Sequence, residues 1–194
     1  CPGCGHGILN RIIADVMREL DMEETAICSL AVGCCGWMID TFAMDCVQAQ
    51  HGRAPAVAAG LKRCRPHNPV IAYQGDGDAL AIGFAETMQI AMAGETITCV
   101  SVNNGGCGRT GGQMAPTTLA GQKTATSVRG RDTAATGQPT DSVKLLGQFD
   151  SVKYLARGSL HSPVEVRRTA KFSRRALETQ INGVGYSLVE VLAP

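Results

Sequence analysis

Strand-like and helix-like segments alternate along nearly the whole chain, and this alternation restricts the possible folds more than any other feature. Apolar runs typical of buried strands cover residues 25–32, 69–73, 96–102, 152–156 and 186–192. Helix-favouring segments cover residues 6–20, 53–65, 79–93, 141–149 and 162–181. Such alternation predicts an α/β fold in which helices cover both faces of a mostly parallel sheet. In sheets of this kind, ligands bind beyond the carboxyl ends of the strands.

The length suits one domain with a full core, so we expect a single domain over residues 1–194. A net charge of only +1 argues against a nucleic-acid-binding protein. No apolar run reaches the roughly 20 residues of a membrane helix, so we expect a cytoplasmic protein that does not enter membranes. The chain starts at Cys1 rather than Met and stops at Pro194 just after a strand-like segment. We therefore expect a domain that is cut short at its C-terminus.

Residues 103–139 differ from the rest of the chain, because Gly, Thr, Gln, Ser and Pro dominate and no periodicity is visible. Long stretches without regular structure inside a domain are usually functional or disordered. The glycine, glutamine and threonine content favours a loop wrapped around a ligand.

Polar residues follow two of the predicted strands at the points where they end. Gly75-Asp76-Gly77-Asp78 follows one strand, and Asn103-Asn104 follows the next. Mg²⁺ prefers oxygen ligands and is usually bound by carboxylates together with the phosphates of a substrate or cofactor. The Asp76 carboxylate and the Asn104 amide oxygen could bind it, and a backbone carbonyl, for which we expect that of Gly106, could complete the protein ligands. Gly75 and Gly77 would let the backbone approach a diphosphate, and the helix starting near Ala79 offers its N-terminus. The alternative is two unrelated polar turns.

The same residues resemble the thiamine-diphosphate motif, and further segments resemble one branch of that superfamily. Together they are similar to the β subunits of 2-oxoacid:ferredoxin oxidoreductases. The segment 113–119, Gln-Met-Ala-Pro-Thr-Thr-Leu, favours the 2-oxoisovalerate and 2-oxoglutarate branch. The segments that carry the resemblance are Cys1-Pro2-Gly3-Cys4-Gly5-His6, His51-Gly52-Arg53-Ala54, Gly75-Asp76-Gly77-Asp78-Ala79-Leu80-Ala81-Ile82-Gly83, Thr110-Gly111-Gly112-Gln113 and Ala115-Pro116-Thr117.

This resemblance implies oxidative decarboxylation by a hetero-oligomer. A 2-oxoacid loses carbon dioxide, electrons pass singly through a [4Fe–4S] cluster to ferredoxin, and coenzyme A takes the acyl group. The β subunit holds the diphosphate half of thiamine diphosphate with Mg²⁺. An α subunit supplies the pyrimidine half of the site and the glutamate that activates the cofactor.

The resemblance also implies roles for single residues. Asp76 and Asn104, with the carbonyl of Gly106, match the metal ligands. His51 and Arg53 match a segment near the active site, where a cation could meet diphosphate or the substrate carboxylate. The remaining cofactor-binding positions are Gly75, Gly77, Asp78, Thr110 and Gln113.

The chain has nine cysteines, and seven of them fall into two groups. Cys1-x-x-Cys4 suits an iron–sulfur site, a zinc site or a redox pair. The resemblance adds Cys34 as a third cluster ligand and places a fourth cysteine directly after Pro194, beyond this sequence. Isolated cysteines are expected to be small buried hydrophobic residues. These are Cys28, Cys46, Cys64 and Cys99.

The loop after the asparagines departs from the family pattern. Gly105-Gly106-Cys107-Gly108-Arg109-Thr110 has Cys107 in place of an aromatic residue and Arg109 in place of an apolar one. Arg109 could pair with a second carboxylate of the substrate, which would favour 2-oxoglutarate. The loop could also be a tolerated variation or impair activity. Two other functions stay open: a non-oxidative thiamine-diphosphate enzyme, and a non-catalytic electron-transfer or assembly subunit.

Overall fold

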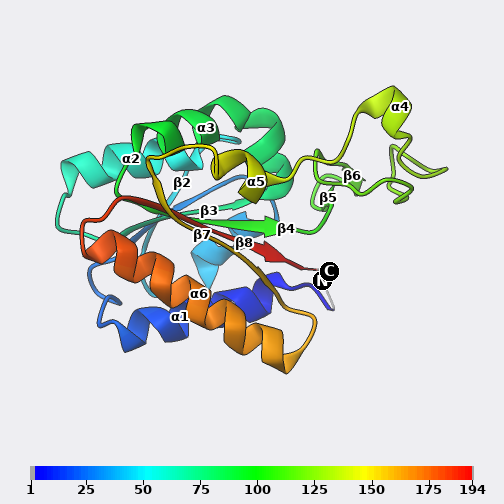
Figure 1. Cartoon of the computed structure of the whole chain (residues 1–194). Helices are drawn as coiled ribbons and strands as arrows, with labels where there is room; N and C mark the ends of the chain where they lie inside the picture. Colours follow the sequence, from blue (N-terminus) through cyan, green and yellow to red (C-terminus); the bar gives the residue numbers. More distant parts are fainter. Residues whose placement is uncertain (1–2, 194) are drawn as a thin grey trace.

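A six-stranded parallel sheet forms the centre of the protein (Figure 1). The structure is a computed structural model, and it describes residues 3–193. The strand order is β2-β1-β3-β4-β8-β7, so the α/β fold with a parallel sheet is confirmed. The strands are β1 (Ile27–Leu30), β2 (Asp45–Gln48), β3 (Val70–Gly75), β4 (Thr98–Asn103), β7 (Val152–Ser159) and β8 (Tyr186–Leu192).

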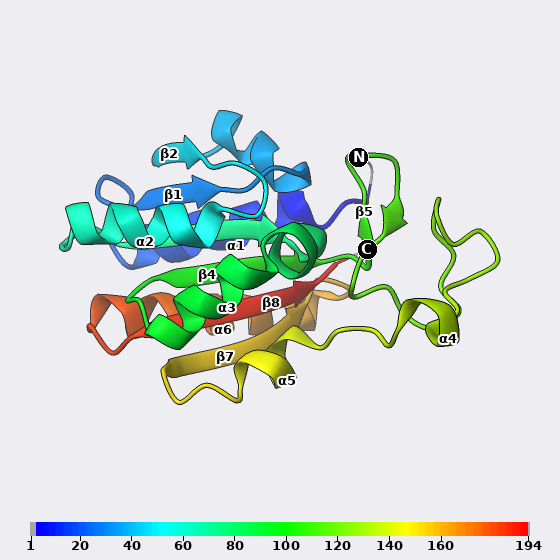
Figure 2. The ribbon, with the colours of Figure 1, turned by 90° about the horizontal axis from the view of Figure 1, so that it is seen from above.

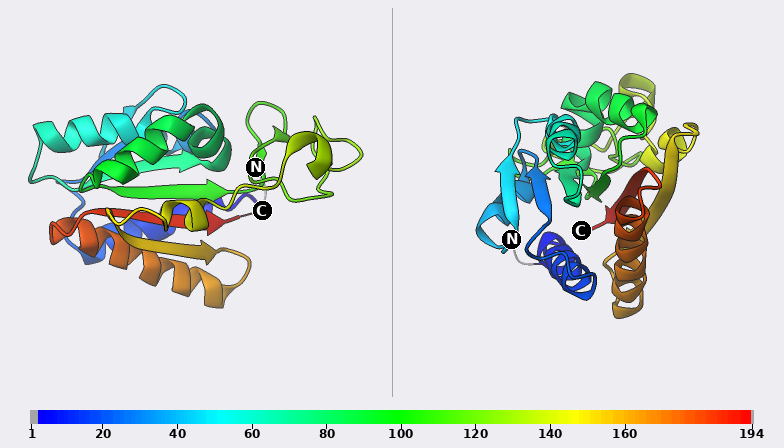
Figure 3. Two further views of the ribbon diagram at one scale, coloured as in Figure 1. Left: turned by 45° about the horizontal axis from the view of Figure 1, so that its top comes forward. Right: turned by 90° about the vertical axis from the view of Figure 1, so that its left-hand side faces the viewer.

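Helices cover both faces of this sheet, as the alternating pattern predicts (Figure 3). One face carries α1 (His6–Glu19) and α6 (Pro163–Ile181), and the other carries α2 (Ala54–Cys64), α3 (Phe84–Ala93) and the short α5 (Ser142–Leu146). Successive strand residues point to opposite faces, so each face has its own apolar core. In β3, for example, Tyr73 packs into the core beneath α1 and α6, whereas Ala72 packs into the core beneath α2 and α3.

The predicted helix over residues 79–93 is interrupted in the structure. A five-residue π-helical turn, η2 (Asp78–Ile82), comes first, and α3 starts only at Phe84. The break at Gly83 coincides with a close backbone contact. A β-carbon at Gly83 would lie 2.5 Å from the carbonyl oxygen of Gly52. This contact fixes the segment after β3 against the segment that carries His51.

We expect Gly52→Ala to lower the free energy of unfolding by about 2–3 kcal/mol. Gly52 has φ +78°, and an added β-carbon would lie 2.6 Å from the backbone nitrogen of Gly83. Urea unfolding of the purified protein measures the effect. Gly60→Ala in α2 is the control, because a β-carbon there meets nothing within 4 Å and alanine favours the helix. Equal unfolding midpoints for the two variants would contradict the prediction.

Several elements were not expected from the sequence. They are the 3₁₀ helix η1 (Cys34–Asp40), the edge strand β2, the two-stranded hairpin of β5 (Gly106–Cys107) and β6 (Gln113–Met114), and the short α4 (Thr133–Thr136). The hairpin and α4 belong to the long segment between β4 and α5, which extends beyond the carboxyl edge of the sheet (Figure 2).

The isolated cysteines follow the expectation only in part. Cys28 and Cys99 are buried in central strands, as expected. Cys46 is half-buried on the edge strand β2. Cys64 is exposed, because it lies in the last turn of α2 beyond the buried face of that helix, so the expectation was wrong there.

Within residues 3–193, no helix is long and apolar enough to cross a membrane.

Candidate functional site

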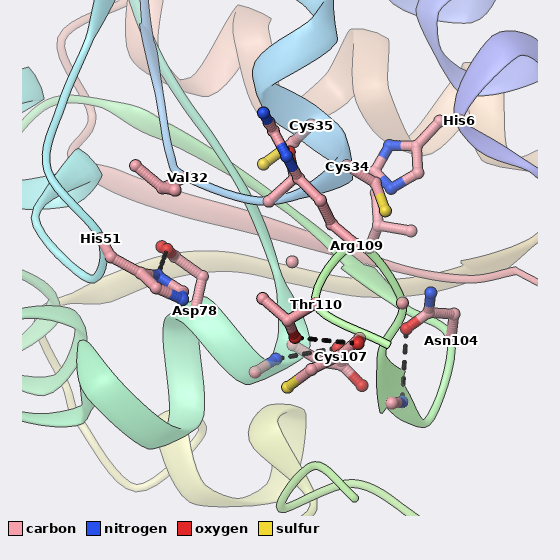
Figure 4. Close-up of a pocket in the computed structure, with 17 residues that line it drawn as sticks. His6, Val32, Cys34, Cys35, His51, Asp78, Asn104, Cys107, Arg109 and Thr110 are labelled. Carbon is pink, nitrogen blue, oxygen red and sulfur yellow. Dashed lines mark hydrogen bonds and ion pairs between the residues drawn. The ribbon is translucent and has the colours of Figure 1, made fainter. Parts of the chain in front are cut away.

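A cavity of about 280 Å³ lies beyond the carboxyl ends of the central strands (Figure 4). It is bounded by the segment after β1 and the start of η1, by His51, by the end of β3, and by the loop after β4. The site residues expected from the sequence that line it are Cys34, His51, Gly75, Asp76, Gly77, Asp78, Asn104, Gly106, Arg109 and Thr110.

Asp76 joins the two polar segments. Its carboxylate is buried and accepts hydrogen bonds from the backbone N–H groups of Gly77 (2.8 Å) and Gly105 (3.0 Å) and from the hydroxyl of Thr117. These donors are all uncharged, and burial raises the pKa of Asp76 above its usual range. A buried carboxylate with only neutral partners is stabilised by a bound cation.

The backbone around Asp76 leaves room for a ligand on one side and closes the cavity on the other. A β-carbon at Gly75 would meet no atom within 4 Å. At Gly77, by contrast, it would lie 2.5 Å from the sulfur of Cys107. Across the cavity, the Asn104 side-chain oxygen accepts a hydrogen bond from the Gly106 N–H at 3.3 Å. Asp76, Asn104 and Gly106 all line this cavity, and a carboxylate, an amide oxygen and a backbone carbonyl are a donor set that fits Mg²⁺.

His51 and Asp78 form a second polar pair in the cavity. Nδ1 of His51 contacts Oδ1 of Asp78, which also accepts a hydrogen bond from the Gly52 N–H at 3.0 Å. The other oxygen of Asp78 is buried and has no partner among the described residues. Burial raises the pKa of the Asp78 carboxyl, while the contacts from Gly52 and His51 lower it. Because Nδ1 is engaged, Nε2 is the ring nitrogen that remains available to a ligand.

Arg53 and Gln113 do not line the cavity. The Arg53 guanidinium pairs with Glu86 at 3.0 Å instead. The Gln113 side-chain oxygen accepts a hydrogen bond from the Thr110 hydroxyl (2.6 Å), and its amide nitrogen donates to the Thr110 carbonyl (2.8 Å). Gln113 therefore supports a residue that lines the cavity but does not reach the cavity itself.

Arg109 connects the loop after β4 to η1. Its Nη1 donates to the carbonyl oxygen of Gly33 at 3.0 Å, and its guanidinium lies 4.7 Å from the ring centre of Trp37. The ring of Trp37 is itself exposed. This arrangement holds a permanent positive charge at the edge of the cavity.

The expected cluster ligands are represented by Cys4 and Cys34, since Cys1 lies outside the described residues. Cys34 lines the cavity, and Cys4 is half-buried just before the start of α1. A β-carbon at Gly5 would lie 2.6 Å from the β-carbon of Ala193, which puts the segment after Cys4 beside the end of β8. In residues 3–193, no three His, Cys, Asp or Glu side chains are grouped closely enough to hold a metal.

A family model described as the thiamine pyrophosphate enzyme, C-terminal TPP binding domain, matches residues 31–191. The chain belongs to this family.

Individual relatives of this thiamine diphosphate-binding domain belong to the enzyme class that the sequence motifs indicated. Ketoisovalerate oxidoreductase subunit VorA of Methanothermobacter thermautotrophicus is 45% identical over the whole chain, which covers 41% of that protein. 2-Oxoglutarate synthase subunit KorB of Archaeoglobus fulgidus is 38% identical over 62% of the chain and 45% of its own length. This chain thus spans less than half of these relatives.

A solved structure shares the fold. It is a 2-oxoglutarate:ferredoxin oxidoreductase from Magnetococcus marinus with 2-oxoglutarate, coenzyme A and succinyl-CoA bound. The TM-score is 0.83 at 26% identity, covering all of this chain and 62% of the other. The resemblance to 2-oxoacid:ferredoxin oxidoreductases that the motifs indicated is confirmed.

Sequence reasoning about this thiamine diphosphate-binding domain missed several residues of the cavity. Val32 and Cys35 line it without having been singled out as site residues, and His6 lines it although it was noted only as the last residue of the Cys1–His6 segment. His6 is buried, and its Nδ1 lies 2.9 Å from the Tyr73 hydroxyl. Thr117 was noted only as part of a motif, and its hydrogen bond to Asp76 spans 41 positions of the chain. Such long-range contacts leave no periodic signal in the sequence.

Proposed function

We propose that this domain is the diphosphate-binding part of a β-type subunit in a 2-oxoacid:ferredoxin oxidoreductase, converting a 2-oxoacid to acyl-CoA and carbon dioxide. The observation that carries the proposal is the direct link between the two halves of the motif, from the Gly105 N–H to the Asp76 carboxylate inside the cavity. The 45% identity to a ketoisovalerate oxidoreductase subunit supports the reaction class.

In this proposal, Asp76, Asn104 and the Gly106 carbonyl hold Mg²⁺, and the backbone at Gly75 and Gly77 faces the diphosphate. The buried and uncompensated charge of Asp76 and the open space at Gly75 support the assignment. Thiamine diphosphate, when bound, supplies the nucleophilic carbon and electron sink needed to remove carbon dioxide from a 2-oxoacid. The chain's own residues bind and orient it.

We assign His51 and Thr110 to contacts with the diphosphate or the substrate. Asp78 fixes the ring of His51, so that Nε2 keeps one orientation in the cavity. Gln113 holds the backbone and hydroxyl of Thr110 in the same way. Arg53 is assigned a supporting position next to His51, because its charge is already paired with Glu86.

The activating acid is assigned to the α subunit. Asp76 and Asp78 are the carboxylates that line the cavity in residues 3–193, and both are engaged in the motif. A glutamate is absent from this described lining. The site therefore needs a residue from outside this domain.

Cys4 and Cys34, together with Cys1, are proposed to bind a [4Fe–4S] cluster that passes electrons to ferredoxin. The position of Gly5, the residue after Cys4, beside the end of β8 supports this, because the resemblance expects a further cysteine just after that strand. Iron and acid-labile sulfide analysis of the intact protein tests it. Zinc in place of iron and sulfide would contradict it.

Calorimetric titration of the intact complex tests the whole proposal. We expect thiamine diphosphate to bind only when Mg²⁺ is present, and ferredoxin to be reduced when a branched 2-oxoacid or 2-oxoglutarate and coenzyme A are added. Release of carbon dioxide and an aldehyde without ferredoxin reduction would indicate a non-oxidative enzyme. No cofactor binding at all would indicate an electron-transfer or assembly subunit.

We expect Arg109→Met to separate the two candidate substrates. If Arg109 pairs with a second carboxylate, kcat/KM for 2-oxoglutarate falls by about 10–100-fold, the value of a charge-assisted hydrogen bond pair. The value for 2-oxoisovalerate, which has no second carboxylate, stays within about threefold, since only packing changes. Steady-state kinetics of the complex with both acids measure this. An equal fall in kcat/KM for both acids would mean that Arg109 does not bind the second carboxylate.

A further inference from the structure

Glu190 is a buried carboxylate in the middle of the sheet. It lies in β8, between Ser101 of β4 and Arg157 of β7, and only 1% of it is exposed. Its oxygens accept hydrogen bonds from three different elements. The donors are the side-chain amide of Asn103 (3.0 Å), the hydroxyl of Ser142 (2.7 Å) and Nε of Arg157.

These donors mark both ends of the long segment that carries the candidate site. Asn103 is the last residue of β4, just before the segment begins, and Ser142 is the first residue of α5, just after it ends. Arg157 adds a second link to the far end, because its Nη2 lies 2.5 Å from Asp141, the residue that caps α5. One carboxylate thus holds the start and the end of residues 104–140 together.

The contact with Asn103 continues into the cavity. While its amide nitrogen donates to Glu190, its side-chain oxygen accepts a hydrogen bond from the Gly105 N–H at 3.2 Å. The same N–H donates to Asp76 at 3.0 Å. Asn104 lies between these two fixed residues, so the orientation of the Asn103 side chain determines where the Asn104 backbone runs.

The stability of the sheet alone does not account for a carboxylate at this position. Burying a charge costs free energy, and buried ion pairs often add no more stability than apolar side chains of similar volume. The neighbouring residues of β8, Val189 and Val191, are apolar and fully buried. Glu190 instead fixes the orientation of the side chains that donate hydrogen bonds to it, because these side chains could otherwise rotate.

We infer that Glu190 is a positioning residue for the metal and diphosphate site, acting through Asn103 and Gly105 on Asp76 and Asn104. This inference rests on the proposed function. Glu190 touches no ligand itself, and its effect is to hold the loop after β4 in the geometry that brings the amide and carboxylate oxygens together.

The test measures metal affinity rather than turnover. In the intact complex freed of metal, Mn²⁺ is titrated in the presence of thiamine diphosphate, and free Mn²⁺ is followed by electron paramagnetic resonance. We expect Glu190→Gln to raise the Kd for Mn²⁺ by about 10–100-fold, as for residues that orient metal ligands. The amide NH₂ of glutamine would face one of the three donors, so Asn103 loses its fixed orientation.

Ser187→Ala is the matched control in the same strand. Ser187 is fully buried, and its hydroxyl bonds to Thr98 (3.0 Å) and to the Ala176 carbonyl (2.9 Å), away from the cavity. We expect it to lower the melting temperature while the Kd for Mn²⁺ changes by no more than about twofold, because the sites are independent. Asn103→Ala serves as a second variant if Glu190→Gln does not fold, and it is expected to weaken Mn²⁺ binding in the same range.

The outcomes separate the inference from the proposed function. If the wild-type complex binds Mn²⁺ with thiamine diphosphate but Glu190→Gln and Asn103→Ala bind it as tightly as Ser187→Ala does, the inference is wrong and the function stands. If the wild-type complex shows no such binding, the proposed function fails, and the inference fails with it.

Discussion

Asp76→Asn is expected to weaken Mg²⁺-dependent binding of thiamine diphosphate by at least about 100-fold, because it removes the charge of a buried ligand. The amide keeps the shape of the side chain. Its nitrogen, however, cannot accept the hydrogen bonds that the carboxylate receives from Gly77, Gly105 and Thr117. Isothermal titration of the intact complex with the cofactor, at fixed Mg²⁺, measures the change.

The same variant is expected to change the stability of the apoprotein by no more than about 1 kcal/mol, because a lost hydrogen bond is offset by removal of a buried charge. Asp45→Asn on the exposed edge strand β2 is the control for loss of a carboxylate. The metal assignment would be overturned if Asp76→Asn bound the cofactor as tightly as Asp45→Asn does.

Arg131→Met is expected to lower the free energy of unfolding of the long segment by about 3–5 kcal/mol, because several buried carbonyl groups lose their donor. Arg131 is buried, although it carries a charge. Its guanidinium donates to backbone carbonyl groups that come both before and after Arg131 in the long segment. They belong to Ala115 (3.4 Å), Pro116 (2.9 Å), Thr118 (2.6 Å), Thr136 (3.4 Å) and Gln138 (3.2 Å).

Loss of the Arg131 side chain is also expected to disturb the residues around the cavity. Thr117 lies between two of these acceptors and bonds to Asp76, while the Thr118 hydroxyl bonds to the Gly105 carbonyl at 2.6 Å. Hydrogen exchange and limited proteolysis measure the opening of residues 104–140. Arg129→Met is the control, since Arg129 is exposed in the same segment. Equal cleavage rates in the two variants would show that Arg131 does not hold the segment.

The central strands and the helices that cover them could be predicted from the sequence. Strands such as β3 and β4 are nearly continuous apolar runs because both of their faces are covered, and this makes their ends recognisable. The positions of Asp76 and Asn104 follow from those ends. The edge strand β2 was missed for the opposite reason: its residues are largely exposed, so it has no apolar run.

The direction of side chains next to a motif could not be predicted. His51 and Arg53 are two residues apart, yet His51 lines the cavity and Arg53 pairs with Glu86 on α3. The turn at Gly52, with its positive φ, separates them. Contacts such as Glu190 with Asn103 join residues 87 positions apart, and a single sequence carries no periodic trace of them.

The anchoring of both ends of residues 104–140 at Glu190 also bears on how this domain can vary in length. When the two ends of a loop are held at a fixed separation, the entropic cost of adding residues grows only with the logarithm of the loop length. Insertions in the outer part of the segment, around the exposed α4, therefore cost little as long as Asn103, Ser142 and Arg131 keep their contacts. The region around α4 is thus where the domain can gain new surface without rebuilding its cavity.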